Sequence, residues 1–153
     1  MRKNLLSLQK WISEATELQI PLAEFLIDLN MRQMDCSEAE LMNKMDVMLK
    51  VMEKSIEQGM RGEKSHSGLT GGSAKILGEA KANSLLGDLG HKAVTYAMAV
   101  GECNAAMGRI VAAPTAGASG VLPGVFFALK ECRCLTDEEL KRGLVVAGSI
   151  GLV

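Results

Sequence analysis

Hydrophobic residues recur every three to four positions along much of this chain, the spacing that places side chains on one face of an α-helix. Near the start, this pattern predicts an amphipathic helix whose apolar face contains Leu5, Leu8, Ile12 and Ala15. Pro21 interrupts the pattern, because proline lacks the backbone N–H that a helix interior needs. The periodicity that follows predicts a second helix over residues 22–34.

A capping box predicts the start of a long third helix over residues 38–60. Ser37 and Glu40 have the spacing at which each side chain bonds the backbone N–H of the other residue. One face of this helix carries an apolar stripe of Leu41, Met45, Met48 and Met52. A methionine stripe is compatible with an adaptable partner-binding face, but packing in the core is the favoured interpretation.

Four further helices are expected, over residues 73–86, 91–107, about 122–131 and from 137 onward. Ser73 is the predicted N-cap of the first, and Gly87 and Gly90 punctuate the chain before the second. The second is rich in alanine, so neighbouring backbones can approach it closely. Thr136 and Glu139 form another capping-box pattern, which predicts the start of the last helix.

The composition favours an all-α fold. Hydrophobic residues make up 48% of the chain and aromatic residues only 3%, so the core must be aliphatic, with ten methionines available to fill it. The strongest candidate strand, residues 109–113, is short and belongs to no series of strands. We therefore expect a single multi-helix domain over residues 1–153, with two glycine-rich loops between helices.

Charge and apolar length exclude two classes of function. The net charge of −1 gives no electrostatic case for binding nucleic acid or an anionic membrane. Residues 110–129 carry no charge and are long enough to cross a bilayer. Pro114, Pro123 and three glycines would break such a helix and leave backbone groups unpaired in lipid. A buried loop followed by a buried helix is expected there instead.

The four cysteines show neither disulfide-framework nor zinc-site spacing; they are Cys36, Cys103, Cys132 and Cys134. The first residues lack the continuous apolar run of a secretory signal. We therefore expect reduced thiols, no metal site and a cytoplasmic location. The end of the chain is an increasingly apolar run from Leu140 to Val153, which suggests that a larger fold has been truncated at its C-terminus.

The candidate functional segments of this chain are two glycine-rich stretches, residues 67–72 and 114–120. Both are small, polar and uncharged, and both are expected just before a helix, where exposed N–H groups favour an anion. The first segment is also compatible with an ordinary connection between helices. The second lies in an uncharged stretch that is expected to be buried, so its N–H groups need internal partners or a ligand. Together they suggest a site for a small carboxylate or phosphate, which Asn104 could help to orient.

These segments resemble those of a known family. The runs Ser-Gly-Leu-Thr-Gly-Gly at 67–72, Asn-Ala-Ala-Met-Gly-Arg-Ile-Val-Ala-Ala-Pro-Thr-Ala-Gly at 104–117 and Gly-Val-Leu-Pro-Gly at 120–124 closely resemble the α-subunit of the bacterial iron–sulfur L-serine dehydratases. The resemblance extends from the third helix to Val153. It implies a lyase of amino-acid degradation and gluconeogenesis that converts L-serine to pyruvate and ammonia. It also implies a β-subunit or β-domain as partner, and a homo-oligomer.

In that family, a [4Fe–4S] cluster has an iron that lacks a cysteine ligand and acts as a Lewis acid on the serine hydroxyl. A base removes the α-proton, water leaves, and the resulting aminoacrylate hydrolyses. The resemblance places the family's cluster cysteines in the C-terminal half of the subunit, beyond Val153. No cofactor is therefore expected in this chain alone, which is expected to be inactive by itself.

The resemblance assigns eight substrate-binding residues. One side of the pocket would consist of Ser67, Thr70, Gly71 and Gly72, and the other of Asn104, Thr115, Ala116 and Gly117. No residue is assigned as the catalytic base. Relatives often have an acidic residue at the position of Ser73, and this departure is interpreted as a change of helix cap.

Three other functions are alternatives to that of an iron–sulfur serine dehydratase. Two of them stay open from the sequence, and the fold pattern argues against the third. A related lyase could act on another small amino acid such as cysteine, because both substrates share the same carboxylate. A non-catalytic helical interaction module is compatible with the methionine stripe and the apolar end. Pyridoxal-phosphate chemistry would need a Schiff-base lysine in an α/β fold, and the strand–helix alternation of that fold is missing.

Overall fold

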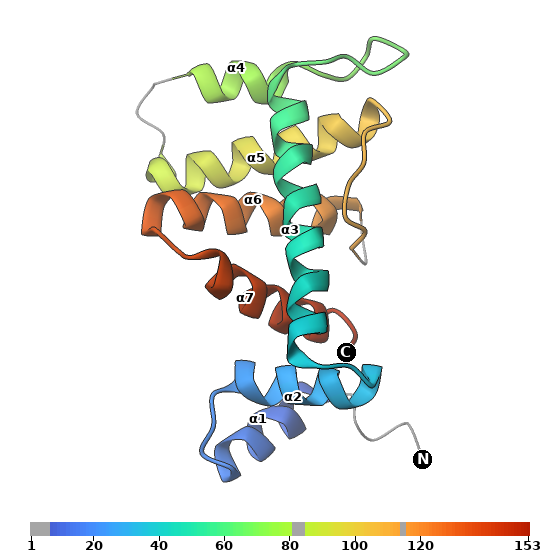
Figure 1. Cartoon of the computed structure of the whole chain (residues 1–153). Coiled ribbons are helices and arrows are strands. Elements are labelled where there is room, and N and C mark those ends of the chain that lie inside the picture. Colours follow the sequence, from blue (N-terminus) through green and yellow to red (C-terminus); the bar gives the residue numbers. More distant parts are fainter. Residues whose placement is uncertain (1–6, 81–84, 114–115) are drawn as a thin grey trace. The chain divides into compact units, whose positions relative to one another are not determined.

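The computed structural model describes residues 7–80, 85–113 and 116–153, which form seven helices and no strand (Figure 1). The helices are α1 (Leu8–Glu17), α2 (Leu22–Met34), α3 (Glu38–Met60), α4 (Ser73–Glu79), α5 (Gly87–Ala105), α6 (Ala116–Arg133) and α7 (Asp137–Ile150). The prediction of an all-α fold is confirmed. Across these described ranges, each helix is too short or too polar to span a membrane.

Contacts divide the chain into two compact units. The first combines the residues up to Asp46 with Asp137–Val153, and the second contains Val47–Thr136. The α3 helix therefore contributes its beginning to the first unit and its remainder to the second. A single domain over residues 1–153 stays a prediction. All the candidate site residues that the structure describes belong to the second unit.

The first unit has a core built by α1, α2 and α7. Its centre is Trp11, Ala15, Phe25 and Leu26, with Leu22, Leu29 and Val146 packed against it. The amide of Asn30 on α2 donates a hydrogen bond of 2.9 Å to Ser149 Oγ on α7. The predicted bounds of α2 are confirmed, and Pro21 is its N-cap residue.

The capping box at the start of α3 forms as predicted. Ser37 N donates to Glu40 Oε2 over 2.8 Å, and Glu40 N donates to Ser37 Oγ over 3.3 Å. The helix then covers the predicted residues 38–60. In its apolar stripe Leu41, Met45 and Met52 are buried, while Met48 is 40% exposed. Core packing is therefore the correct interpretation for most of the stripe.

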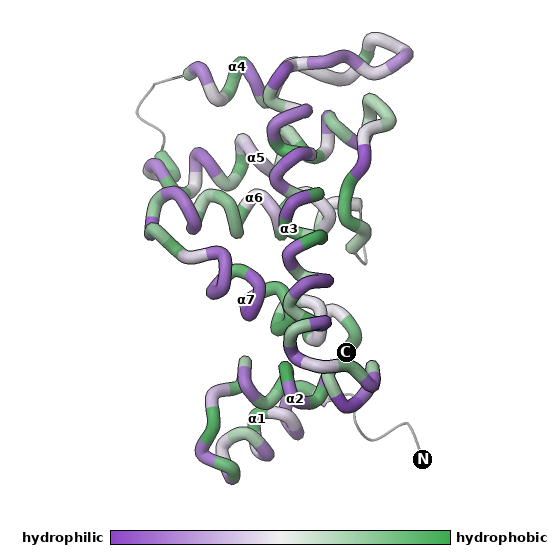
Figure 2. Tube along the Cα trace, in the orientation of Figure 1, coloured by the Kyte–Doolittle hydropathy of each residue, from purple (hydrophilic) through white to green (hydrophobic). Residues whose placement is uncertain are grey.

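The second unit is organised around α5 and α6, which lie side by side in antiparallel directions (Figure 1). Gly120 and Gly124 of α6 face Ala97 and Ala93 of α5 along what we call the α5–α6 seam. A Cβ atom at position 120 would lie 2.8 Å from the carbonyl oxygen of Ala97, and one at position 124 would lie 2.6 Å from that of Ala93. The expected close approach of backbones at the alanine-rich helix is thus confirmed. Figure 2 shows that α6 is mainly hydrophobic.

The start of α6 differs from the prediction. The helix begins at Ala116, so residues 116–120 are its first turns and do not form a loop. Pro123 lies inside the helix, whereas the sequence predicted it near the helix start. The glycines of this segment were interpreted as helix breakers, but Gly120 is required by the close packing against α5.

The bounds of α4 and α5 also differ. Gly72 is the N-cap residue of α4 and Ser73 is its first helical residue, so the prediction of Ser73 as N-cap is wrong. Residues 81–84 of the predicted helix lie outside the described residues. The α5 helix already begins at Gly87, and Gly90 lies within it.

Residues 109–113, the strongest candidate strand in the sequence, form no strand. Met107 adopts a left-handed φ of 64°, and Gly108 N donates to Cys103 O over 2.8 Å, a common way to end a helix. The segment that follows is irregular and leads back to α6. Its last described residue, Ala113, donates its N–H to Ser119 Oγ over 3.1 Å.

Candidate functional site

The first glycine-rich segment is a turn held by its own hydrogen bonds. Ser65 N donates to Thr70 O and Gly68 N donates to Ser65 O, both over 2.8 Å. Thr70 N also donates to Ser65 Oγ over 3.2 Å. The side chains of Ser67 and Thr70 are exposed, so their hydroxyl groups are accessible from solvent. Figure 2 shows that the whole connection between α3 and α4 is mainly hydrophilic.

Gly71 occupies a position that only glycine fits. Its φ is 125°, in a region that other residues rarely adopt. A Cβ atom at this position would overlap the carbonyl oxygen of Glu63 and lie 2.8 Å from the Cα atom of Lys64. The backbone of the turn is therefore defined closely at the point where it enters α4.

The start of α4 already binds an anion, and that anion is a side chain of the same chain. Glu102 on α5 is only 6% exposed, and its carboxylate accepts hydrogen bonds from three consecutive N–H groups. The donors are Gly72, Ser73 and Ala74, at 2.9, 2.8 and 3.3 Å. These are the N–H groups at the helix start that the sequence suggested for a ligand. The partial positive charge at the start of α4 therefore stabilises Glu102.

The residues of the second side lie where α5 ends and α6 begins. Asn104 is exposed in the last turn of α5, two residues after Glu102, and Gly117 is exposed in the first turn of α6. Ala116 is the first residue of α6, and Thr115 lies outside the described residues. Because α5 and α6 are antiparallel, the start of α6 lies beside the end of α5.

The structure thus brings both sides of the predicted pocket to one end of the α5–α6 pair. Glu102 ties Gly72 to the last turns of α5, which also carry Asn104, and Gly117 opens the neighbouring helix. Among the described residues, no hydrogen bond is found between any two of Gly72, Asn104 and Gly117. The assignment of the eight residues to a substrate pocket stays a prediction.

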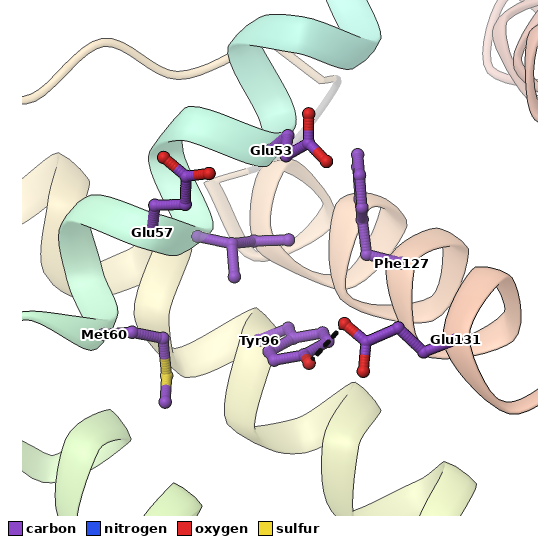
Figure 3. A pocket seen from close by; sticks show the side chains of 7 residues that line it. Glu53, Glu57, Met60, Tyr96, Phe127 and Glu131 are labelled. Carbon is purple, nitrogen blue, oxygen red and sulfur yellow. Dashed lines mark hydrogen bonds between the residues drawn. The ribbon is translucent and has the colours of Figure 1, made fainter. Parts of the chain in front are cut away.

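A separate cavity of about 320 Å³ opens between α3, α5 and α6 (Figure 3). Its lining contains none of the predicted site residues and consists of Glu53, Ile56, Glu57, Met60, Tyr96, Phe127 and Glu131. Tyr96 donates its O–H to Glu131 over 2.7 Å, as the dashed line in Figure 3 marks. Lys92 pairs with the other oxygen of Glu131 over 2.5 Å. Glu131 therefore joins α5 to α6, and each of its carboxylate oxygens already has a partner within the chain.

This pairing predicts a pH-dependent contribution to stability. Burial opposes ionisation of Glu131, but the hydrogen bonds from Lys92 and Tyr96 outweigh it and lower the pKa of its carboxyl. A carboxyl with a lowered pKa stabilises the fold above its unfolded-state pKa, and this stabilisation is lost as the pH falls through the folded-state pKa. Burial raises the pKa of Tyr96, so its O–H remains a donor at neutral pH.

Tyr96→Phe is expected to lower the free energy of unfolding by about 1 kcal/mol near pH 7, the value for a hydrogen bond to a partly exposed carboxylate. At a second pH below the lowered folded-state pKa of Glu131, where its carboxyl is protonated, the difference from the unchanged chain should shrink to less than half. Urea unfolding followed by circular dichroism at both pH values measures this. An equal difference at both pH values would contradict the assigned role of the Glu131 charge.

The described residues do not fit an iron–sulfur cluster. Such clusters need several cysteine thiolates around one site. Within the described ranges, no group of three or more His, Cys, Asp or Glu side chains is placed to hold a metal. The four cysteines are free, and burial raises the pKa of the Cys103 thiol, which disfavours the thiolate that a metal needs.

The fold and the paired segments agree with comparisons of the sequence. The profile of the serine dehydratase alpha chain family matches residues 9–153. This all-α chain therefore belongs to the serine dehydratase alpha chain family. It is 39% identical over 149 residues to the probable L-serine dehydratase alpha chain of Bacillus subtilis (strain 168), covering 96% of this chain and 50% of the relative.

Two other relatives support the same family. The L-serine dehydratase alpha chain of Peptoniphilus asaccharolyticus is 29% identical over 145 residues, which cover 93% of this chain and 50% of that protein. The L-serine dehydratase of Haemophilus influenzae is 49% identical over 57 residues, 37% of this chain and 12% of that protein. The chain thus spans about half the length of the alpha chains it matches. No solved structure matches it.

Proposed function

We propose that this chain carries the substrate-binding segments of an L-serine dehydratase, which converts L-serine to pyruvate and ammonia. The observation that carries the proposal is the bond between Glu102 and the start of α4. It gathers the first glycine-rich segment and Asn104 at one end of α5, as a pocket built from these two sequence-distant segments requires. Membership of the serine dehydratase family supplies the substrate class.

The chain's own residues would bind and orient the amino acid. The exposed hydroxyl groups of Ser67 and Thr70 and the amide of Asn104 are neutral donors suited to a carboxylate. Holding the carboxylate fixes the direction of the α-proton and of the leaving hydroxyl group, and such orientation accounts for much of enzymatic rate enhancement. A [4Fe–4S] cluster would be bound by residues outside these 153, and a β-chain would complete the enzyme.

The test is an activity assay of the complete alpha chain produced anaerobically with its β-chain. We expect pyruvate to form from L-serine, together with cluster-type iron and sulfide in the purified protein. Turnover of L-cysteine with none of L-serine would favour the alternative lyase. Absence of turnover of either amino acid by the iron-loaded protein would favour a non-catalytic module.

A further inference from the structure

We propose that Glu102 is a positioning residue of the substrate site, whose carboxylate holds the Gly71–Gly72 backbone in the conformation that binds serine. This inference rests on the proposed function and assigns a role to a residue outside the eight predicted ones. Glu102 itself does not contact the substrate in this proposal. It acts through the turn that it anchors.

The Glu102 carboxylate is buried, and its hydrogen-bond partners are backbone N–H groups at the start of α4. The side chain is 6% exposed, and an ionised carboxylate in such a place must be compensated. No lysine, arginine or histidine of the described ranges forms an ion pair with it. Its partners are the N–H groups of Gly72, Ser73 and Ala74, and hydrogen bonds to an ionised acceptor are about twice as strong as neutral ones.

Apart from the hydrogen bonds within the turn, few buried contacts hold it in place. Ala74 is the one buried residue of α4, which is only seven residues long. In the turn itself, Leu69 is 90% exposed and Ser67 and Thr70 are exposed as well. A segment with so few buried contacts has low local stability, so each specific contact with the rest of the fold matters for its order. The Glu102 carboxylate is the anchor that joins it to α5, a helix with five buried residues.

Loss of this anchor has a distinct kinetic signature. When only a fraction of the enzyme has the binding-competent turn, the apparent affinity for substrate equals the intrinsic affinity multiplied by that fraction. Bound serine then restores the turn, so the rate at saturation changes little. A purely structural role would instead reduce the amount of active enzyme, which lowers kcat and leaves KM unchanged.

The experiment compares Glu102→Gln with Glu57→Gln in the complete enzyme with its β-chain. Glu57 is an exposed carboxylate on α3 outside the proposed site, so it controls for the loss of one negative charge. We expect Glu102→Gln to raise KM for L-serine about tenfold with kcat within about twofold, following the loss of the competent population. Amide hydrogen exchange at residues 70–74 should accelerate in Glu102→Gln and remain unchanged in Glu57→Gln.

Several results would overturn the inference. These are an unchanged KM, a fall in kcat at constant KM, or unchanged exchange at residues 70–74. If Glu102→Gln does not fold, Glu102→Asp keeps the charge but shortens its reach, and a KM raised by about threefold or more is then expected. An unchanged KM in Glu102→Asp would also overturn it. A wild-type enzyme inactive on serine refutes the proposed function itself, whereas an active wild type with normal variants refutes only the role of Glu102.

Discussion

Gly59→Ala is expected to lower the free energy of unfolding of the chain by about 3 kcal/mol, the upper part of the usual range for overpacking. Gly59 lies on α3 where this helix crosses α5. A Cβ atom there would overlap the carbonyl oxygen of Ala99 and lie 2.6 Å from its Cα atom. Both obstructing atoms belong to the backbone, so no side-chain rotation relieves the overlap and the two helices must separate.

Gly101→Ala is the matched control for this prediction. Gly101 is also a helical glycine, on α5, but a Cβ atom there would meet no atom within 4 Å. This substitution is expected to stabilise the chain by about 0.5–1 kcal/mol, because alanine loses less backbone entropy in a helix than glycine. Urea unfolding followed by circular dichroism measures both effects. Equal behaviour of the two variants would contradict the close crossing of α3 and α5.

Gly71→Ala in the complete enzyme is expected to reduce kcat/KM for L-serine about 100-fold or more, because displacements of about 1 Å in a substrate-positioning group have effects of this size. The residue combines a φ of 125° with backbone neighbours that leave no room for a methyl group. The turn must therefore change its path. Most of the helical structure lies elsewhere, so the far-ultraviolet circular dichroism spectrum should stay the same.

Gly68→Ala separates backbone strain from steric overlap. Gly68 lies in the same turn with a φ of 73°, but nothing lies within 4 Å of a Cβ atom placed there. Its substitution carries only the conformational cost of about 1 kcal/mol for a left-handed residue and should reduce kcat/KM less than about tenfold. Gly71→Ala with normal serine turnover would remove this turn from the substrate site.

The elements predicted best are those whose signals are local. Pro21 and the pair Ser37–Glu40 set the starts of α2 and α3 within a few residues of sequence, and both helices have the predicted bounds. The capping box needs only residues that neighbour each other along the chain. Apolar periodicity then defines which face is buried, as Leu41 and Met52 show.

The elements predicted poorly depend on residues distant in sequence. Gly87, Gly90 and Gly120 were interpreted as breaks between helices, yet all three are helical. A glycine in sequence signals either a turn or a close helix contact, and the packing partner decides between them. For Gly120 that partner is Ala97, more than twenty residues away on another helix.

The sequence identified the segments of the candidate site but not Glu102, the residue that joins them. The glycine-rich turn and Asn104 were identified from the sequence, and the structure places both at one end of α5. Glu102 was missed because its partners lie 28 to 30 residues away. The available signal was a lone acidic residue within the small and apolar residues of the alanine-rich helix, where a buried charge demands compensation.

The α5–α6 seam has an entropic consequence for the site beside it. Glycine and alanine have no side-chain rotamers, so Gly120, Gly124, Ala93 and Ala97 lose no side-chain entropy when the helices associate. For the same reason, no change of side-chain rotamer can loosen the seam, and its packing depends on the backbones alone. The seam therefore brings the end of α5, which carries Asn104, and the start of α6, which carries Gly117, together at no cost in side-chain entropy.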